Sequence, residues 1–132
     1  MALSTPLRRS RLRYHPHAYL FVTEALQLTQ ELLGREAIET PDDEGAHITG
    51  RELLDGIRVL GLKQFGMMAV PVFKAWGVTT TEDFGRIVFE MVERGELRKT
   101  DRDSLADFQD IYSFHEAFQE DYRVETSKAF RS

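Results

Sequence analysis

The chain has 132 residues, of which 42% are hydrophobic and 30% charged, and these proportions are typical of one soluble globular domain. It contains no cysteine, which excludes disulfides, thiolate metal sites and cysteine nucleophiles. The net charge is −5, but residues 1–13 contain Arg8, Arg9, Arg11 and Arg13 and no acid, so the remaining residues carry −9.

This charge distribution predicts a basic arm at residues 1–13, a single domain at 14–122 and a C-terminal tail at 123–132. A basic arm can contact phosphate groups or an acidic surface, and a flexible, solubilising terminus is the simpler interpretation. The longest apolar run near the start, 18–22, is far too short to span a membrane or to form the core of a signal peptide. We therefore expect a cytoplasmic protein without membrane contact.

The first predicted helix begins at His15-Pro16-His17, because proline in the first helical turn leaves no hydrogen bond unmade. Its apolar residues recur at helical spacing, at Ala18, Phe21, Val22, Ala25, Leu26, Leu32 and Leu33. Gly34 is a suitable C-terminal cap for this helix. Residues 35–48 contain a proline, a glycine and five acids with little periodicity, which predicts a surface linker.

A second helix is predicted to begin at Thr49, since Thr49 and Glu52 have the spacing of a capping box. Its apolar stripe consists of Leu53, Leu54, Ile57, Leu60 and Phe65. Gly56 and Gly61 weaken this helix by about 1 kcal/mol each relative to alanine. They either permit the close approach of another helix or are a tolerated weakness.

The third predicted helix lies within Met68–Trp76, with Pro71 in its first turn. Trp76 is expected to fill the core beneath a turn at which Gly77 supplies a left-handed cap. Met67 and Met68 are expected to fill core space beside Trp76, the alternative being an adaptable hydrophobic groove.

Either Thr79 with Glu82 or Thr80 with Asp83 can cap the fourth helix. That helix has the strongest periodic signal in the chain, an apolar stripe of Phe84, Ile87, Val88, Met91 and Val92. Gly95 ends it, and Leu97–Thr100 is predicted to form a short strand.

Residues 103–122 allow two interpretations. Apolar and aromatic residues recur every three or four positions, which favours one long helix, at Leu105, Phe108, Tyr112, His115, Phe118 and Tyr122. Alternatively, residues at about 108–114 form a strand that pairs with Leu97–Thr100 as a β-hairpin, and Ser113 with Glu116 caps a final helix. The hairpin is slightly favoured, because Gly95-Glu96-Leu97 suits a chain entering it.

The run from Val72 to Thr79, followed by an amphipathic helix and Leu97, resembles the helix-turn-helix of winged-helix proteins. Phe73 stands where that motif usually has a small residue, and Phe84 and Ile87 fall one residue later than usual, which implies a longer turn. The resemblance implies a mainly α fold, a compact helical domain with a winged-helix-like helix-turn-helix and a short β-hairpin.

A second resemblance spans most of residues 14–118. The segments YHPHAYLFVTEAL, ITGRELLDGIR and TTEDFGRIVFEMVERGELRKT are similar to those of a small bacterial protein family of unknown function. This resemblance implies no activity, cofactor or catalytic residue.

The outward side of the fourth helix does not favour DNA, because four of its five charged residues are acids that phosphate repels: Glu82, Asp83, Glu90 and Glu93, with Arg86 as the exception. Phe89 lies toward this charged side, where it is either covered by another segment or a protein-contact anchor. The predicted partner-binding residues are Arg86, Phe89, Glu90 and Glu93. The alternative is a nucleic-acid surface formed by Arg8, Arg9, Arg11, Arg13, Arg98, Lys99 and Arg102.

Residues for catalysis or metal binding are sparse. His15 and His17 form a His-x-His pair, with His47 and His115 elsewhere, and hydrogen bonds to the backbone near the helix start are the favoured interpretation of the pair. The acids Asp42, Asp43 and Glu44, and separately Asp103, Asp107 and Asp110, are expected to lie on solvated faces.

We therefore predict a non-catalytic protein-interaction or regulatory domain without a cofactor. A nucleic-acid-binding regulator and a small metal-dependent or acid/base enzyme are the alternatives.

Overall fold

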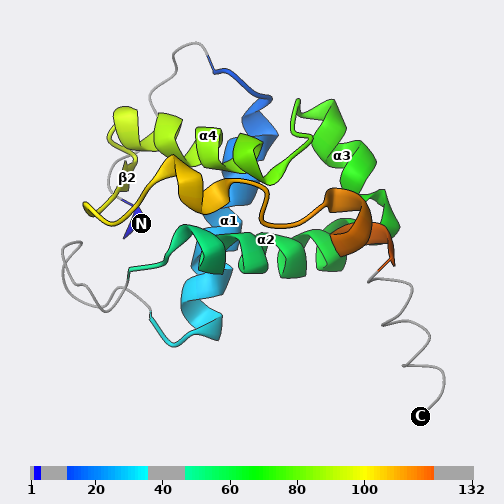
Figure 1. Ribbon diagram of the computed structural model, residues 1–132, viewed down its shortest axis with the longest axis horizontal. Helices are drawn as coiled ribbons and strands as arrows, with labels where there is room; N and C mark the ends of the chain where they lie inside the picture. The colour runs from blue at the N-terminus through cyan, green and yellow to red at the C-terminus, as the bar shows by residue number, and fades with distance from the viewer. Residues whose placement is uncertain (1, 4–11, 36–46, 121–132) are drawn as a thin grey trace.

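The computed structural model describes residues 2–3, 12–35 and 47–120, which form a mainly helical fold (Figure 1). The elements are β1 (Ala2–Leu3), α1 (Pro16–Leu32), α2 (Gly50–Phe65), the 3-10 helix η2 (Gly66–Met68), α3 (Ala69–Ala75), α4 (Thr81–Glu93), β2 (Leu97–Arg98), the 3-10 helix η3 (Leu105–Phe108) and the π-helix η4 (Glu116–Glu120). In Figure 1, α2 and α4 lie side by side, α1 passes behind both, and the segment containing η3 runs in front between them. The predicted tail at 123–132 lies outside the described residues, as do most of the arm and of the linker.

The helices begin where the capping residues predict. The imidazole Nδ1 of His15 accepts a hydrogen bond from the His17 N–H at 3.1 Å, and Pro16 is the first residue of α1. Thr49 and Glu52 exchange the two bonds of a capping box at the start of α2. Of the two caps proposed for α4, Thr80 with Asp83 is the one formed. Local sequence therefore determines these three helix starts.

The crossing of α1 and α2 depends on a glycine. A Cβ built on Gly56 would overlap the hydroxyl oxygen of Thr29 and lie 3.3 Å from the carbonyl oxygen of Ala25. A Cβ on Gly61 would lie 2.8 Å from the ring of Phe118. Both glycines therefore permit close packing, and the alternative of a tolerated weakness is wrong for them.

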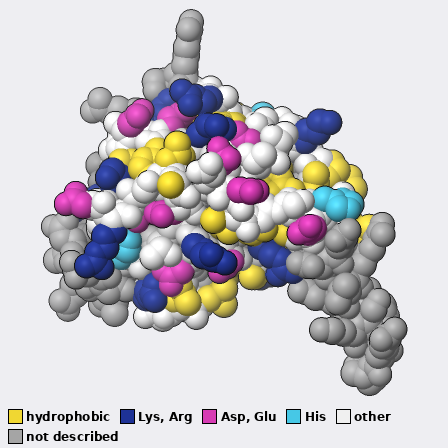
Figure 2. Space-filling view, in the orientation of Figure 1, with side chains coloured by type: hydrophobic (Ala, Val, Ile, Leu, Met, Phe, Trp, Pro, Cys, Tyr) yellow, Lys and Arg dark blue, Asp and Glu magenta, His cyan; other side chains and the backbone are white. Residues whose placement is uncertain are grey.

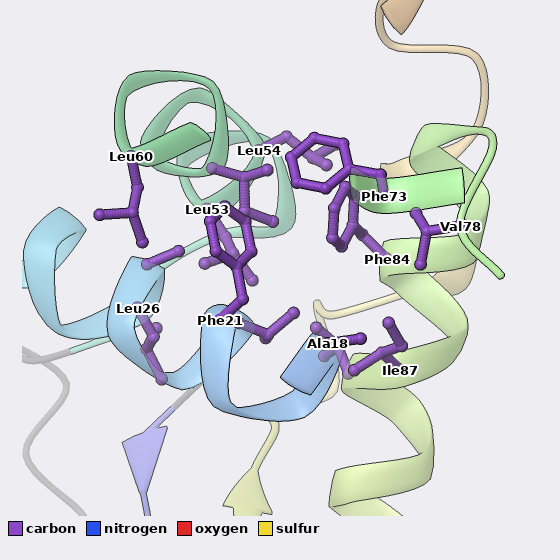
Figure 3. Close-up of a cluster of buried hydrophobic side chains, with 14 of the residues drawn as sticks. Ala18, Phe21, Leu26, Leu53, Leu54, Leu60, Phe73, Val78, Phe84 and Ile87 are labelled. Atoms are coloured by element: carbon purple, nitrogen blue, oxygen red, sulfur yellow. The ribbon is translucent and has the colours of Figure 1, made fainter. Parts of the chain in front are cut away.

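The core is an aromatic and aliphatic cluster to which all four α-helices contribute (Figure 3). Phe73, which stands where the helix-turn-helix pattern usually has a small residue, is fully buried at its centre. Its ring lies within 5.2–6.2 Å of six other aromatic rings, those of Phe21, Phe65, Trp76, Phe84, Phe114 and Phe118. A small residue at this position would leave a void between α3 and the rest of the core.

Trp76 and the two methionines are placed differently from the prediction. Phe73 takes the central position, so Trp76 is only half-buried at the edge of the core, beside the predicted left-handed Gly77 (φ 89°). Met67 and Met68 are 44% and 61% exposed, so the expectation that they fill core space is wrong.

The C-terminal third agrees with the sequence-based interpretations only in a final helical stretch at residues 114–120, which begins directly after Ser113. β2 pairs antiparallel with β1, with Leu97 opposite Leu3, and residues 108–114 contain no strand. A single long helix is also wrong, because Gln109 is extended, Asp110 has a positive φ of 50° and residues 111–113 belong to no helix. The buried hydroxyl of Thr81 donates to the Phe108 carbonyl at 2.6 Å and accepts from the Ile111 N–H at 3.3 Å. This side chain satisfies backbone groups that a strand partner would otherwise bind.

Candidate functional site

The outer face of α4 carries the four predicted partner-binding residues, and the structure distributes them among different neighbours. Arg86 is exposed and contacts Asp83 at 2.9 Å and Glu82 at 3.7 Å. The ring of half-buried Phe89 meets that of Phe108 edge-on, with centroids 6.4 Å apart, so η3 partly covers it.

Glu90 and Glu93 complete this predicted set. Glu90 accepts a hydrogen bond from the Tyr19 hydroxyl at 2.5 Å and lies 3.6 Å from the Nε of Arg94, whereas Glu93 is exposed. Three of the four predicted side chains therefore have intramolecular partners, and their role in binding a partner stays a prediction.

Asp83 organises the start of α4. Its carboxylate accepts hydrogen bonds from the N–H groups of Thr79 and Thr80 at 2.9 and 3.2 Å, and from the Tyr14 hydroxyl at 2.7 Å. Burial raises the pKa of Asp83, but the bonds from Thr79, Tyr14 and Thr80 outweigh burial and hold the pKa below its usual value. The carboxylate thus joins the segment before α1 to the N-terminus of α4.

Tyr19 makes a parallel connection further along α4. Its hydroxyl donates to Glu90 and accepts hydrogen bonds from the N–H groups of Arg13 and Tyr14 at 3.1 and 3.2 Å. Burial and the bond to Glu90 raise the pKa of Tyr19 to about 12. The phenol therefore stays protonated at neutral pH and holds the end of the arm against α4.

The residues predicted for nucleic-acid binding are only partly described. Arg13, Arg98, Lys99 and Arg102 are exposed, whereas Arg8, Arg9 and Arg11 lie outside the described residues. The pairing of β1 with β2 places the start of the arm beside Arg98. On the face shown in Figure 2, however, Lys and Arg side chains are interspersed with Asp and Glu side chains.

The four histidines lie apart from one another, except for the pair at the start of α1. The rings of His15 and His17 have centroids 4.8 Å apart, and the predicted backbone bond is made by His15. His47 lies 3.3 Å from Asp103, and His115 is 2.7 Å from Gln119. Within residues 2–3, 12–35 and 47–120, no three His, Asp or Glu side chains are placed to hold a metal ion.

Two of the acids expected on solvated faces have local structural roles, and the Asp103 side chain is only 7% exposed, so the expectation is wrong for this residue. Asp103 accepts from the Thr100 N–H at 2.9 Å, and Asp107 accepts from the Ser104 N–H at 3.0 Å. Asp110 is exposed, and Asp42, Asp43 and Glu44 lie outside the described residues.

The sequence did not predict a groove of about 310 Å³ between α1, the end of α2 and α3. The side chains that line it are those of His17, Leu20, Phe21, Glu24, Gln64, Phe65, Val72 and Trp76. The rings of Phe21, Phe65 and Trp76 lie 5.4–5.9 Å from one another, and Leu20 beside them is 58% exposed. We call this set of lining residues the aromatic groove.

Leu20 is the sequence signal that could have indicated the aromatic groove. It falls outside the predicted apolar stripe of α1 and lies between His17 and Glu24 at spacings of three and four residues. A large apolar residue among polar ones on a helix can indicate an interaction surface. Leu20 indicates a groove only together with Phe65, Val72 and Trp76, which the fold places beside it.

A comparison with known protein families, curated proteins and solved structures gives no match to this chain. The resemblances to winged-helix proteins and to a bacterial family therefore stay predictions.

Among the described helices, none is long and apolar enough to cross a lipid bilayer.

Proposed function

We propose that this chain is a non-catalytic protein-interaction or regulatory domain on a winged-helix-like scaffold. In this proposal α3 and α4 correspond to the helix-turn-helix, and β2 follows α4 in the place of a wing. The observation that carries the interaction function is the aromatic groove. The protein partner docks there, and the outer face of α4 is the alternative contact surface.

The composition of the aromatic groove supports this assignment. Its base holds two phenylalanines and the only tryptophan of the chain, and its edge carries His17, Glu24 and Gln64. Aromatic residues surrounded by a polar rim are typical of the residues that contribute most to protein interfaces. Leu20 adds exposed apolar area that a partner would remove from water.

The α4 face has weaker support. Much of the surface of Phe89 and Glu90 is already in contact with Phe108 and Tyr19. A partner at this face would use the exposed parts of Arg86 and Glu93 together with the uncovered edge of Phe89.

Affinity capture from cell extract with matched variants distinguishes the two surfaces. We expect Leu20→Gln to lose a specific protein that the wild type retains, whereas Leu32→Gln, which replaces a 61% exposed leucine of the same helix away from the groove, retains it. Phe89→Asp tests the α4 face in the same way. A protein lost only with Phe89→Asp would move the site to α4, and one retained by all three variants would contradict both sites.

Binding to nucleic acid is a second candidate function, favoured by the pairing of β1 with β2. The two strands bring the start of a segment with four arginines beside Arg98 and Lys99. We expect a retarded band with duplex or single-stranded DNA or with RNA at or below about 50 mM salt, where phosphate contacts are strongest. Binding should weaken when residues 1–13 are removed and when Arg98 and Lys99 are both changed to alanine. No retardation at low salt would exclude this candidate.

A further inference from the structure

Among the described residues that line the aromatic groove, Glu24 is the one acid, and its hydrogen-bond partner is the neutral side chain of Gln64. The Nε2 of Gln64 donates a hydrogen bond to the Oε2 of Glu24 at 2.9 Å, which fixes the carboxylate at the edge of the groove. Within the described part of the chain, no lysine or arginine lines this groove. Glu24 therefore presents a negative charge directly beside the apolar surface.

The apolar part of the aromatic groove is adjacent to this charge on the same helix. Leu20 lies one turn before Glu24 on α1, and Val72 of α3 and Trp76 directly after α3 form the opposite side. The exposed Glu31 continues the same side of α1 two turns beyond Glu24, about 10 Å along the helix axis. Measured along α1 from the apolar Leu20, the carboxylate of Glu24 therefore lies about one turn further on and that of Glu31 about three turns further on.

From this arrangement we propose that the aromatic groove binds an amphipathic helix of a partner protein that carries apolar residues three or four positions apart and a lysine or arginine facing Glu24. The proposal rests on the proposed interaction function and names the chemistry of its partner. Charge complementarity carries it, because a cation on the occupant would pair with Glu24 at the rim of an apolar contact. Residues 14–132, with a net charge of −9, would attract such a helix at longer range.

A second copy of this chain is a less suitable occupant. One segment of matching charge is the arginine-containing arm, but residues at both ends of that arm already have partners in the same chain. Ala2–Leu3 pairs with β2, and the N–H of Arg13 donates to Tyr19. Swapping the arm into a neighbouring groove would break these contacts.

Trp76 makes the aromatic groove directly observable, because it is the only tryptophan in the chain and lines the site. The probes are two synthetic helical peptides of equal length and identical leucine positions, one with lysine and one with glutamate at every polar position. We expect the leucine–lysine peptide to shift Trp76 emission saturably and to bind at least tenfold more tightly than the leucine–glutamate peptide.

Variants of the full chain locate the binding. Glu24→Gln should weaken the leucine–lysine peptide about twofold to fivefold, the range of one exposed ion pair, and Glu24→Lys should reverse the preference between the two peptides. Leu20→Gln should weaken both peptides. Asp55→Asn removes an exposed acid of α2 that does not line the aromatic groove and should leave the binding of both peptides unchanged.

The outcomes separate this inference from the proposed function. If the two peptides bind equally and Leu20→Gln abolishes the binding of both, the groove remains a binding site, but the inference that its partner is basic is overturned. Binding that responds equally to Asp55→Asn and Glu24→Gln would be general attraction to an acidic protein and would overturn the inference. Binding that Leu20→Gln does not weaken, or no binding at all, would also overturn the groove as the contact surface. A dimer in sedimentation that Leu20→Gln dissociates would identify a second copy as the occupant.

Discussion

The crossing of α1 and α2 at Gly56 gives the sharpest prediction of stability. Replacing a glycine with alanine inside a helix normally stabilises it by about 1 kcal/mol, because alanine loses less backbone entropy on folding. At position 56 the new methyl group would overlap the Thr29 hydroxyl and lie 3.1 Å from the Thr29 Cβ and 3.3 Å from the Ala25 carbonyl oxygen. We therefore expect Gly56→Ala to destabilise the fold.

The expected change in the free energy of unfolding is the sum of two costs and one gain. Overpacking costs about 1–3 kcal/mol, and rotating Thr29 away would break its 2.6 Å hydrogen bond to the Ala25 carbonyl, at about 1 kcal/mol. The gain in helix propensity offsets about 1 kcal/mol of this cost. The net loss in the free energy of unfolding is about 2 kcal/mol, or roughly 8 °C in Tm for a chain of this size. Urea denaturation and thermal unfolding followed by circular dichroism measure both quantities.

A double-mutant cycle with Thr29→Ala assigns the loss to this contact. Without the hydroxyl, the methyl group introduced by Gly56→Ala would face only the two contacts above 3.0 Å, so this substitution should cost about 1 kcal/mol less in the Thr29→Ala background than in the wild type. If Gly56→Ala instead raises the free energy of unfolding in the wild type, the helices do not cross as closely as the structure shows and the reasoning is refuted.

Three further predictions concern buried polar groups. Because the pKa of Asp83 is lowered on folding, its carboxylate stabilises the fold above the usual value of 3.8 and this contribution is lost as the pH falls. Asp83→Asn should cost about 1–3 kcal/mol at pH 7 in urea denaturation, with a difference from wild type that narrows below about pH 4; a constant difference would contradict the assignment. The pKa of Tyr19 is raised to about 12, so its contribution is complete below pH 10 and is lost as the pH rises toward 12. Tyr19→Phe should remove a phenol that ionises near pH 12 from the alkaline absorbance titration. Loss of a phenol that ionises near pH 10 instead would contradict this prediction. Thr81→Val should cost about 1–3 kcal/mol because it leaves the Phe108 carbonyl and the Ile111 N–H without their partner, whereas Thr81→Ser should cost less than half as much; equal costs in thermal unfolding would show that the hydroxyl is unimportant.

The helices could be predicted from the sequence because their signals are local. The caps at Thr49 and Thr80 and the left-handed Gly34 and Gly77 each act within about one helical turn. The apolar stripe of α4 was equally clear, and four of its five residues are buried: Phe84, Ile87, Val88 and Met91. Such signals determine where an element begins and ends without reference to the rest of the chain.

The path after β2 depends on contacts that the sequence pattern cannot show. Phe108 and Phe118 recur at helical spacing, yet Asp110 interrupts the chain with a positive φ and Thr81, far away in sequence, binds the backbone between them. The burial of both rings is correct in the helical interpretation, but the backbone that carries them is not helical throughout. Side-chain periodicity therefore indicated the burial of these two rings, although Leu105 and His115 of the same pattern are exposed, and it gave the wrong backbone conformation.

The same long-range contacts change which surface of the domain can serve a partner. On one side of α4, Tyr14 and Tyr19 bind Asp83 and Glu90, and on another η3 covers part of Phe89. A helix held on two sides by its own chain is better suited to support the fold than to contact another molecule.

The aromatic groove has the opposite arrangement. Leu20 is mostly exposed, and the side chain that fixes Glu24 is the neutral Gln64, so an occupant can add a hydrophobic contact and a charge pair without displacing an internal one. A partner that binds at the groove therefore displaces fewer intramolecular contacts than a partner that binds at α4. This difference is why we assign the interaction surface to the groove.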